Sequence, residues 1–176
     1  MKLRNMTCLF LTGPEGLLCL YRIGSRVADR MYVGAAGGHF EKEELNDPRT
    51  CVLREMKEEL GLEEADLEDL KLRYVAMRLK NGEIRQNYYY FASLKTHRDL
   101  ESTEGALEWV SWEKLSELEM PACAKLAVLH YLREGRYTDK VYGAVACREG
   151  TRFVALEEFA DQRSFSLSHD ACEYEG

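Results

Sequence analysis

Residues 54–62 read Arg-Glu-Met-Lys-Glu-Glu-Leu-Gly-Leu, and the pair Gly37-Gly38 comes before them in the chain. Successive residues of an α-helix are turned by about 100°, so Glu55, Glu58 and Glu59 fall on one face of a helix here. Like charges at these spacings repel one another, and hard divalent cations, which prefer carboxylate oxygens, relieve that repulsion. This helix by itself therefore predicts metal binding.

The same segment carries the signals of a complete helix beside a core. Asp47-Pro48 supplies an N-cap and a proline at the first helical position. Gly61 stands where a left-handed C-cap is expected, so the helix should run from Asp47 to Leu60. Gly37 and Gly38 permit backbone conformations closed to other residues, which allows a carbonyl there to turn towards a metal. The apolar face of the helix consists of Val52, Leu53, Met56 and Leu60.

Together these residues resemble the Nudix box, whose family pattern is G-x5-E-x7-R-E-U-x-E-E-x-G-U, where U is aliphatic. One departure concerns spacing, because nine residues rather than seven separate Glu44 from Arg54, as if Leu45-Asn46 were inserted. Glu43 and Glu41 therefore stay open as alternatives to Glu44. The matching positions are Gly38, Glu44, Arg54, Glu55, Met56, Glu58, Glu59, Gly61 and Leu62.

The resemblance implies a metal site for Mg²⁺ or Mn²⁺. Glu58 and Glu59 are expected to be ligands, Glu55 a further ligand, and the carbonyl of Gly37 to complete the inner shell. Metals at such a site neutralise a pyrophosphate and lower the pKa of the attacking water.

Two further box residues have expected roles beside the metal. Arg54 is expected to pair with Glu44 and to hold the loop against the helix, and contact between Arg54 and a phosphate is the alternative. Gly38 is expected to lie against the substrate. All of these roles come from the resemblance.

Outside the box, four further roles are predicted. A distal glutamate often assists in this family as general base or metal ligand, and Glu104 is the expected one, with solvated loop charge as the alternative. Arg22 ends a strand and is expected to contact substrate, with a surface ion pair as the alternative. Asn87 is a candidate for hydrogen bonding to a base edge. The run Tyr88–Tyr90 is expected to pack mainly in the core.

Composition limits the classes of partner. A formal net charge of −7 argues against a groove for a nucleic-acid polymer, which relies on clustered Lys and Arg. No apolar run approaches the ~20 residues of a membrane span, and no signal-peptide pattern is present at the N-terminus. The six cysteines contain no CxxC motif, which favours free thiols in a reducing compartment. We expect a cytoplasmic protein, a monomer or homodimer, acting on a small nucleotide.

The pattern of elements predicts a mixed α/β fold, in which a curved sheet lies between α-helices, as the Nudix resemblance also implies. The turn residues Asn81-Gly82 indicate a hairpin. Strands are expected over residues 5–12, 17–23, 31–36, 70–79, 84–94, 107–111, 142–148 and 152–156. Helices are expected over residues 47–60, 112–118 and 121–134.

Length indicates one domain, and the resemblance implies a Nudix domain over residues 1–135. Residues 136–176 are expected to form a C-terminal extension packed on the same domain or continuous with it. The polar stretch that begins at Asp161 is expected to be disordered.

These features predict a metal-dependent pyrophosphohydrolase of nucleoside diphosphates linked to another group. The compact form and the upstream segment Leu17–Arg22 look most like enzymes that hydrolyse oxidised nucleoside triphosphates, such as 8-oxo-dGTP, to the monophosphate and pyrophosphate. Hydrolysis of ADP-ribose, a sugar nucleotide or a dinucleoside polyphosphate is an alternative. A non-catalytic module that senses a nucleotide is another.

Overall fold

The computed structural model describes residues 1–23, 29–96 and 98–158. The stretch from Asp161, expected to be disordered, lies outside these residues. Two helices, α1 (Pro48–Leu60) and α2 (Ala122–Arg133), accompany one sheet of eight strands. The strands are β1 (Lys2–Thr12), β2 (Gly16–Arg22), β3 (Met31–Gly34), β4 (Leu67–Lys80), β5 (Glu83–Leu94), β6 (Ala106–Ser111), β7 (Val141–Cys147) and β8 (Gly150–Leu156).

The sheet mixes parallel and antiparallel pairs, which confirms the predicted fold class. Its order is β3-β2-β1-β5-β4-β7-β8, with β6 paired to β2. The pairs β1–β5 and β4–β7 are parallel and the other pairs are antiparallel. Strand β7 joins the edge of β4 through Tyr74 and Tyr142, so residues 141–156 extend the sheet.

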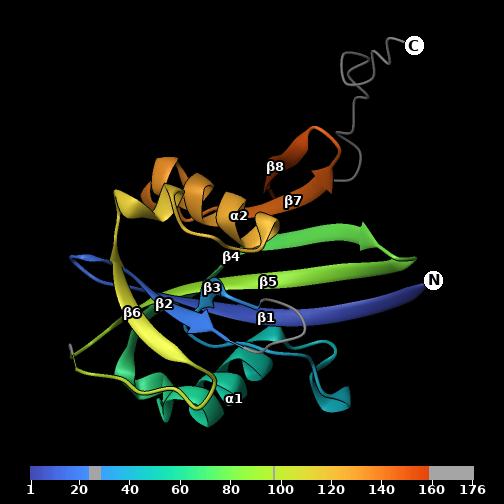
Figure 1. Ribbon diagram of the computed structural model, residues 1–176. Helices are drawn as coiled ribbons and strands as arrows, with labels where there is room; N and C mark the ends of the chain where they lie inside the picture. The colour runs from blue at the N-terminus through green and yellow to red at the C-terminus, as the bar shows by residue number, and fades with distance from the viewer. Residues whose placement is uncertain (24–28, 97, 159–176) are drawn as a thin grey trace.

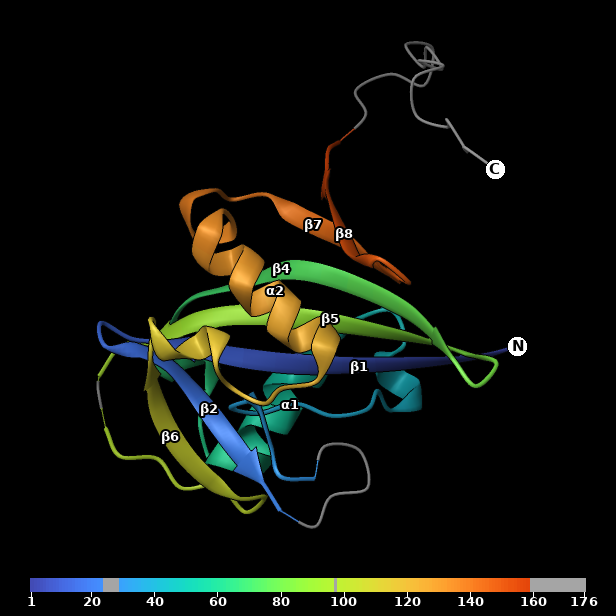
Figure 2. The ribbon, with the colours of Figure 1, turned by 45° about the horizontal axis from the view of Figure 1, so that its top comes forward.

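Each face of the sheet is covered by one helix. In Figure 1, α1 lies below the sheet and α2 above it, and Figure 2 shows α2 crossing the strands at an angle. Successive side chains of a strand point to opposite faces. Accordingly, Leu9 and Leu11 of β1 pack on the α1 side with Val52 and Met56, while Phe10 packs on the α2 side. Strands β1, β2, β4 and β5 contribute residues to both cores.

The predicted signals for α1 are present in the structure. The side chain of Asp47 accepts hydrogen bonds from the backbone N–H groups of Arg49 and Thr50. Gly61 has a φ of 64° and ends the helix with an N–H bond to the carbonyl of Lys57. The helix therefore has fixed ends, which set the position of the carboxylates between them.

Several boundaries differ from the sequence-based expectations. Residues 112–118 do not form a helix, and only a short 3₁₀ turn at Lys114–Ser116 is present. The segment is too short to repay the cost of helix nucleation, and Leu115 is fixed by burial instead. Strand β4 begins at Leu67, earlier than expected, because this residue pairs with Leu94 of β5.

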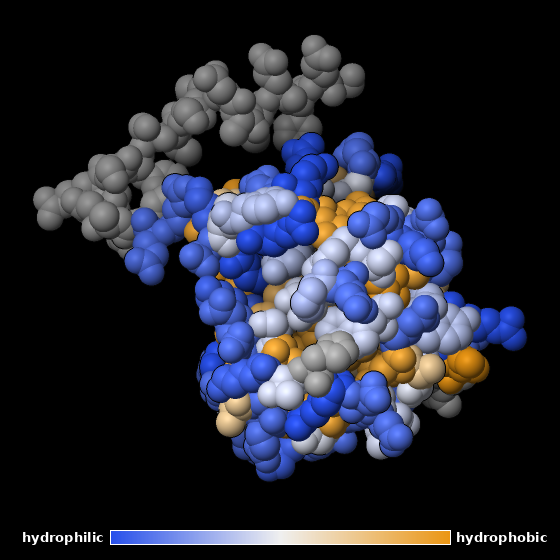
Figure 3. Space-filling view, turned by 90° about the vertical axis from the view of Figure 1, so that its left-hand side faces the viewer, coloured by the Kyte–Doolittle hydropathy of each residue, from blue (hydrophilic) through white to orange (hydrophobic). Residues whose placement is uncertain are grey.

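Tyr89 and Tyr90 are buried on opposite faces of β5, as predicted for core residues. No helix among the described residues is long and apolar enough to cross a membrane. On the face drawn in Figure 3, apolar residues are scattered among hydrophilic ones.

Candidate active site

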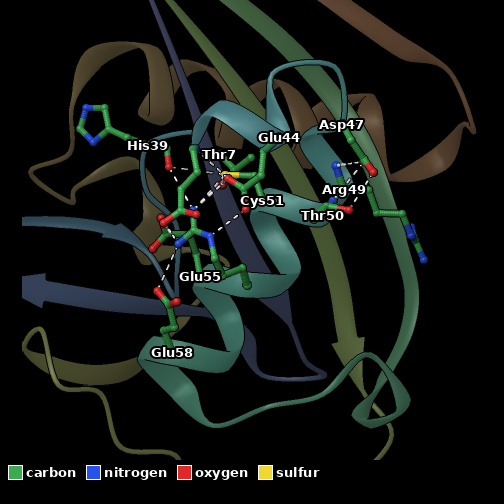
Figure 4. Close-up of polar contacts among 11 residues, drawn as sticks. Thr7, His39, Glu44, Asp47, Arg49, Thr50, Cys51, Glu55 and Glu58 are labelled. Carbon is green, nitrogen blue, oxygen red and sulfur yellow. Dashed lines mark hydrogen bonds and ion pairs between the residues drawn. The ribbon is translucent and has the colours of Figure 1, made fainter.

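Arg54 links the loop that precedes α1 to the helix itself. Its Nε lies 2.7 Å from Oε1 of Glu44, and its Nη2 lies 3.0 Å from Oε2 of the same carboxylate. Nη2 also donates to the carbonyl of His39 at 3.1 Å. Figure 4 shows these contacts around Glu44 and His39. The guanidinium thus fastens both ends of the loop to the helix, and Glu44, rather than Glu41 or Glu43, is its partner.

The pair is nearly closed to solvent on the carboxylate side, because the Glu44 side chain is only 5% exposed. The hydrogen bonds from Arg54 hold the pKa of Glu44 at about 2, far below its ordinary value. The backbone N–H of Glu41 donates to the same carboxylate at 2.9 Å. Glu44 is therefore a charged structural anchor for the loop.

The carboxylates of Glu55, Glu58 and Glu59 on α1, which we name the acidic arc, lie next to this anchor. Nη1 of Arg54 lies 3.0 Å from Oε1 of Glu55 and 3.1 Å from Oε2 of Glu58. Glu59 lies on the other side of the arc, where its Oε2 accepts a hydrogen bond from the backbone N–H of Gly37 at 3.0 Å. One arginine thus holds two of the three carboxylates, and the glycine loop holds the third.

Close contacts surround both glycines, and Gly37 also has a backbone conformation that favours glycine. Gly37 has a φ of 145°, and a Cβ on it would lie 2.3 Å from the carbonyl oxygen of Thr7. A Cβ on Gly38 would lie 2.2 Å from Oε1 of Glu55. The backbone of β1 therefore excludes a side chain at Gly37, whereas a side chain at Gly38 would require the flexible Glu55 carboxylate to move aside.

Burial is the main reason that the pKa of Glu59 is raised above its ordinary value. The N–H of Gly37 opposes the rise, the charge of Glu55 adds to it, and the positive charge of Arg22 lowers it. A half-buried carboxylate of this kind is stabilised in its charged form by a nearby cation.

These donors suit a hard divalent cation. Glu55, Glu58 and Glu59 offer carboxylate oxygens, and the Gly37 carbonyl receives no hydrogen bond from any described residue. Among the described residues, however, no three His, Cys, Asp or Glu side chains already converge as a metal site. Glu55 and Glu58 instead face Arg54, so a cation would compete with the guanidinium for them.

Arg22 and Glu104 lie together, as an ion pair between the end of β2 and the loop before β6. The alternative predicted for Arg22, an ion pair, is thus seen in the structure, although the same residue also lines a pocket. The positive charge of Arg22 also lowers the pKa of Glu59, so Arg22 acts on a carboxylate of α1 as well as on Glu104.

That pocket lies above the sheet on the α2 side, and it joins Arg22 and Gly37 to Asn87. Gly38 is not among its lining residues, and it contacts Glu55 instead. Three arginines and two cysteines of the lining were not among the residues predicted from the sequence. The signal for two of these arginines was available, because Arg78 and Arg85 are equally distant from the Asn81-Gly82 turn. The missed residues are Arg4, Arg78, Arg85, Cys8 and Cys123.

Comparisons with known proteins identify the family and the fold. A family model described as NUDIX domain matches residues 1–132. No curated protein matches the chain.

Among solved structures, the MutT protein of Bacillus halodurans is 20% identical, with 85% of this chain and 97% of that one covered and a TM-score of 0.58. A NUDIX hydrolase from Nitrosomonas europaea is 11% identical, covers 82% and 79%, and has a TM-score of 0.64. A C. elegans Ap4A hydrolase is 14% identical, covers 74% and 95%, and has a TM-score of 0.57. At these identities the structures show a shared fold, and the family model shows membership. The chain therefore belongs to the NUDIX domain family and is a Nudix hydrolase.

Proposed function

We propose that this protein hydrolyses nucleoside triphosphates at a pyrophosphate bond, with 8-oxo-dGTP as the first substrate to test and the monophosphate and pyrophosphate as products. The observation that carries the proposal is the arrangement around Arg54. All three carboxylates of the acidic arc are retained, and the loop that faces them is fixed by Glu44 and lines the same pocket as Arg22 and Asn87.

Glu58, Glu59 and Glu55 would hold Mg²⁺ or Mn²⁺ together with the Gly37 carbonyl. A cation in this position neutralises the pyrophosphate and lowers the pKa of the attacking water. Glu59 is oriented for this role by the N–H of Gly37. The role of Arg54 is to position Glu55 and Glu58, because its Nη1 contacts both carboxylates.

Two residues from outside the helix complete the proposed chemistry. Arg22 would neutralise a phosphate of the substrate, since it lines the same pocket as Gly37. Glu104, held by Arg22, would accept the proton of the attacking water. Arg22 must then exchange part of its contact with Glu104 for the phosphate. Asn87 would hydrogen-bond to the base at the far side of the pocket.

A hydrolysis screen with Mg²⁺ or Mn²⁺ tests the proposal. The substrates are 8-oxo-dGTP, the ordinary nucleoside triphosphates, ADP-ribose, a sugar nucleotide and a dinucleoside polyphosphate. We expect metal-dependent turnover that is greatest for a triphosphate. Glu58→Gln should lower kcat/KM at least about 100-fold, because even residues behind a metal ligand commonly contribute 10- to 100-fold.

Glu68→Gln is the matched control, because Glu68 is an exposed glutamate of β4 away from the acidic arc. It should retain full turnover. Greater turnover of ADP-ribose or a dinucleoside polyphosphate would reassign the substrate class. Nucleotide binding without any turnover would favour the sensor instead.

A further inference from the structure

Three arginines lie side by side across three neighbouring strands of the sheet. Arg4 of β1 is the register partner of Arg85 of β5, and Arg85 is in turn the partner of Arg78 of β4. Like charges directly opposite one another in a sheet are destabilising. We name these three residues the arginine row. Its cost to stability indicates that the row serves a purpose other than folding.

One carboxylate, Glu83, offsets part of this charge. Its Oε1 lies 3.1 Å from Nη2 of Arg4, and its Oε2 lies 2.8 Å from Nε of Arg85. Both Glu83 and Arg85 are largely buried, with side chains 15% and 17% exposed. Glu83 thus fixes the orientation of Arg85 through Nε.

Arg78 differs from its neighbours in the row. None of the described residues forms an ion pair with it, and its buried Nε has no hydrogen-bond partner among them. A buried donor without a partner costs free energy until a ligand or water satisfies it. Arg78 is therefore the member of the row that most needs an acceptor.

The arginine row and Asn87 line the same pocket as Arg22 and Gly37. Between these polar ends, much of the lining is apolar, which suits a flat aromatic ring more than a hydrated phosphate. The apolar lining comes from both the sheet and α2: Leu20, Val33, Ala36, Tyr89, Cys123 and Ala124.

We propose that Arg78, together with Arg85 and Asn87, determines base specificity by donating hydrogen bonds to carbonyl oxygens of the base. The substrate class is then an oxo-substituted base, such as guanine or 8-oxoguanine, rather than adenine. This inference rests on the proposed function, because it assumes that the pyrophosphate lies near Gly37 and Arg22.

The chemistry of the side chains gives the direction of the preference. Arginine donates hydrogen bonds and cannot accept them, so it suits carbonyl oxygens such as O6 of guanine or O6 and O8 of 8-oxoguanine. Adenine carries an exocyclic amine where guanine carries O6, and this amine would place a donor against the donors of Arg78 and Arg85. A site built for hydrogen bonding rejects a ligand that leaves its polar groups unpaired.

Binding of nucleoside monophosphates without metal tests the inference apart from catalysis. Calorimetry would compare 8-oxo-dGMP, dGMP and dAMP on the wild-type chain and on Arg78→Lys, which keeps the charge but loses Nε and the planar fork. We expect 8-oxo-dGMP and dGMP to bind more tightly than dAMP, and Arg78→Lys to reduce that preference about tenfold. Arg85→Lys should reduce it in the same direction.

Arg152→Lys is the control, because Arg152 is exposed on β8, away from the pocket. It should leave all three affinities unchanged, and thermal melting verifies that each variant folds. An equal loss of affinity for all three nucleotides would show that the row binds phosphate and would overturn the inference. Unchanged affinities in Arg78→Lys would overturn it as well. Failure of the proposed function appears separately, as absence of turnover in the hydrolysis screen.

Discussion

The α1 site and the α2-side pocket are built in opposite ways. The α1 site draws its main residues from one segment, Gly37 to Glu59, whose loop and helix are joined by Arg54 and Glu44. The pocket draws its residues from five strands and α2, and the sequence separates Arg4 from Arg78 and Arg85 by about half the chain. Local sequence specifies the first site, whereas strand register specifies the second.

This difference separates cation binding at the α1 site from ligand binding in the pocket. The carboxylates suit a cation, and their positions are set by a helix with fixed ends. The pocket residues instead lie where neighbouring strands place them, and a shift of one residue in register would turn each side chain to the other face. Mutations in the α1 site should therefore change stability and metal binding, whereas mutations in the pocket should change nucleotide affinity.

Arg54→Met should have the largest effect on the α1 site. It leaves the buried Glu44 charge without its guanidinium and removes the cation between Glu55 and Glu58. We expect a loss of about 3 kcal/mol in the free energy of unfolding, as for other buried pairs that lose one partner. Urea denaturation measures the loss.

Arg49→Met is the matched control for that variant. Its ion pair with Glu64 joins two exposed side chains, 47% and 54% exposed. Exposed pairs contribute little, so the loss should stay below about 1 kcal/mol. Equal losses in the two variants would contradict the role of Arg54 as the local anchor.

Acid should weaken the same anchor in a defined range of pH. The pKa of Glu44 is about 2 in the folded chain and near its ordinary value of 4.5 when unfolded, because Arg54 stabilises its charge. The unfolded state therefore binds the proton first as the pH falls. The stabilisation is complete above pH 4.5 and is lost progressively towards pH 2. The free energies of unfolding of the wild type and of Glu44→Gln, plotted against pH, should converge over this range. A constant difference between them would refute the assignment.

Gly82→Val tests whether the pocket depends on the register of the hairpin between β4 and β5. Asn81 and Gly82 have φ values of 54° and 71°, and a β-branched residue at such a φ costs about 1–2 kcal/mol. The hairpin aligns Arg78 with Arg85, so nucleotide affinity should fall while Mn²⁺ binding to the α1 site is retained. Paramagnetic relaxation by Mn²⁺ and nucleotide calorimetry separate the two effects. Loss of both together would mean that the regions are not independent.

Gly38→Ala should have the smallest effect on stability. Its Cβ would meet the far end of the flexible Glu55 side chain, so the carboxylate can move aside. Mn²⁺ affinity should nevertheless fall about tenfold, as when the orientation of a metal ligand is disturbed. Unchanged Mn²⁺ affinity would argue against Glu55 as a ligand. The melting curve of Gly38→Ala should stay close to that of the wild type, which would show that the variant folds.

Sequence patterns predicted the helix of the α1 site well because its signals are local. The Asp47 cap, the Gly61 cap and the 3.6-residue spacing act within a few residues of one another. The spacing in the sequence did not decide which of Glu41, Glu43 and Glu44 pairs with Arg54, because the conformation of an inserted loop cannot be read from its length. The short helix predicted at residues 112–118 was wrong because tertiary packing, not helix propensity, fixes Leu115.

The sequence by itself determined the acidic helix, its caps and the family, because each depends on residues close together in the chain. Only the tertiary structure decided which glutamate pairs with Arg54, that Arg22 meets Glu104, and that three arginines line one pocket. The physical reason is the register of long strands: β1 pairs with β5 across some 80 residues of chain, and no local pattern records that partnership.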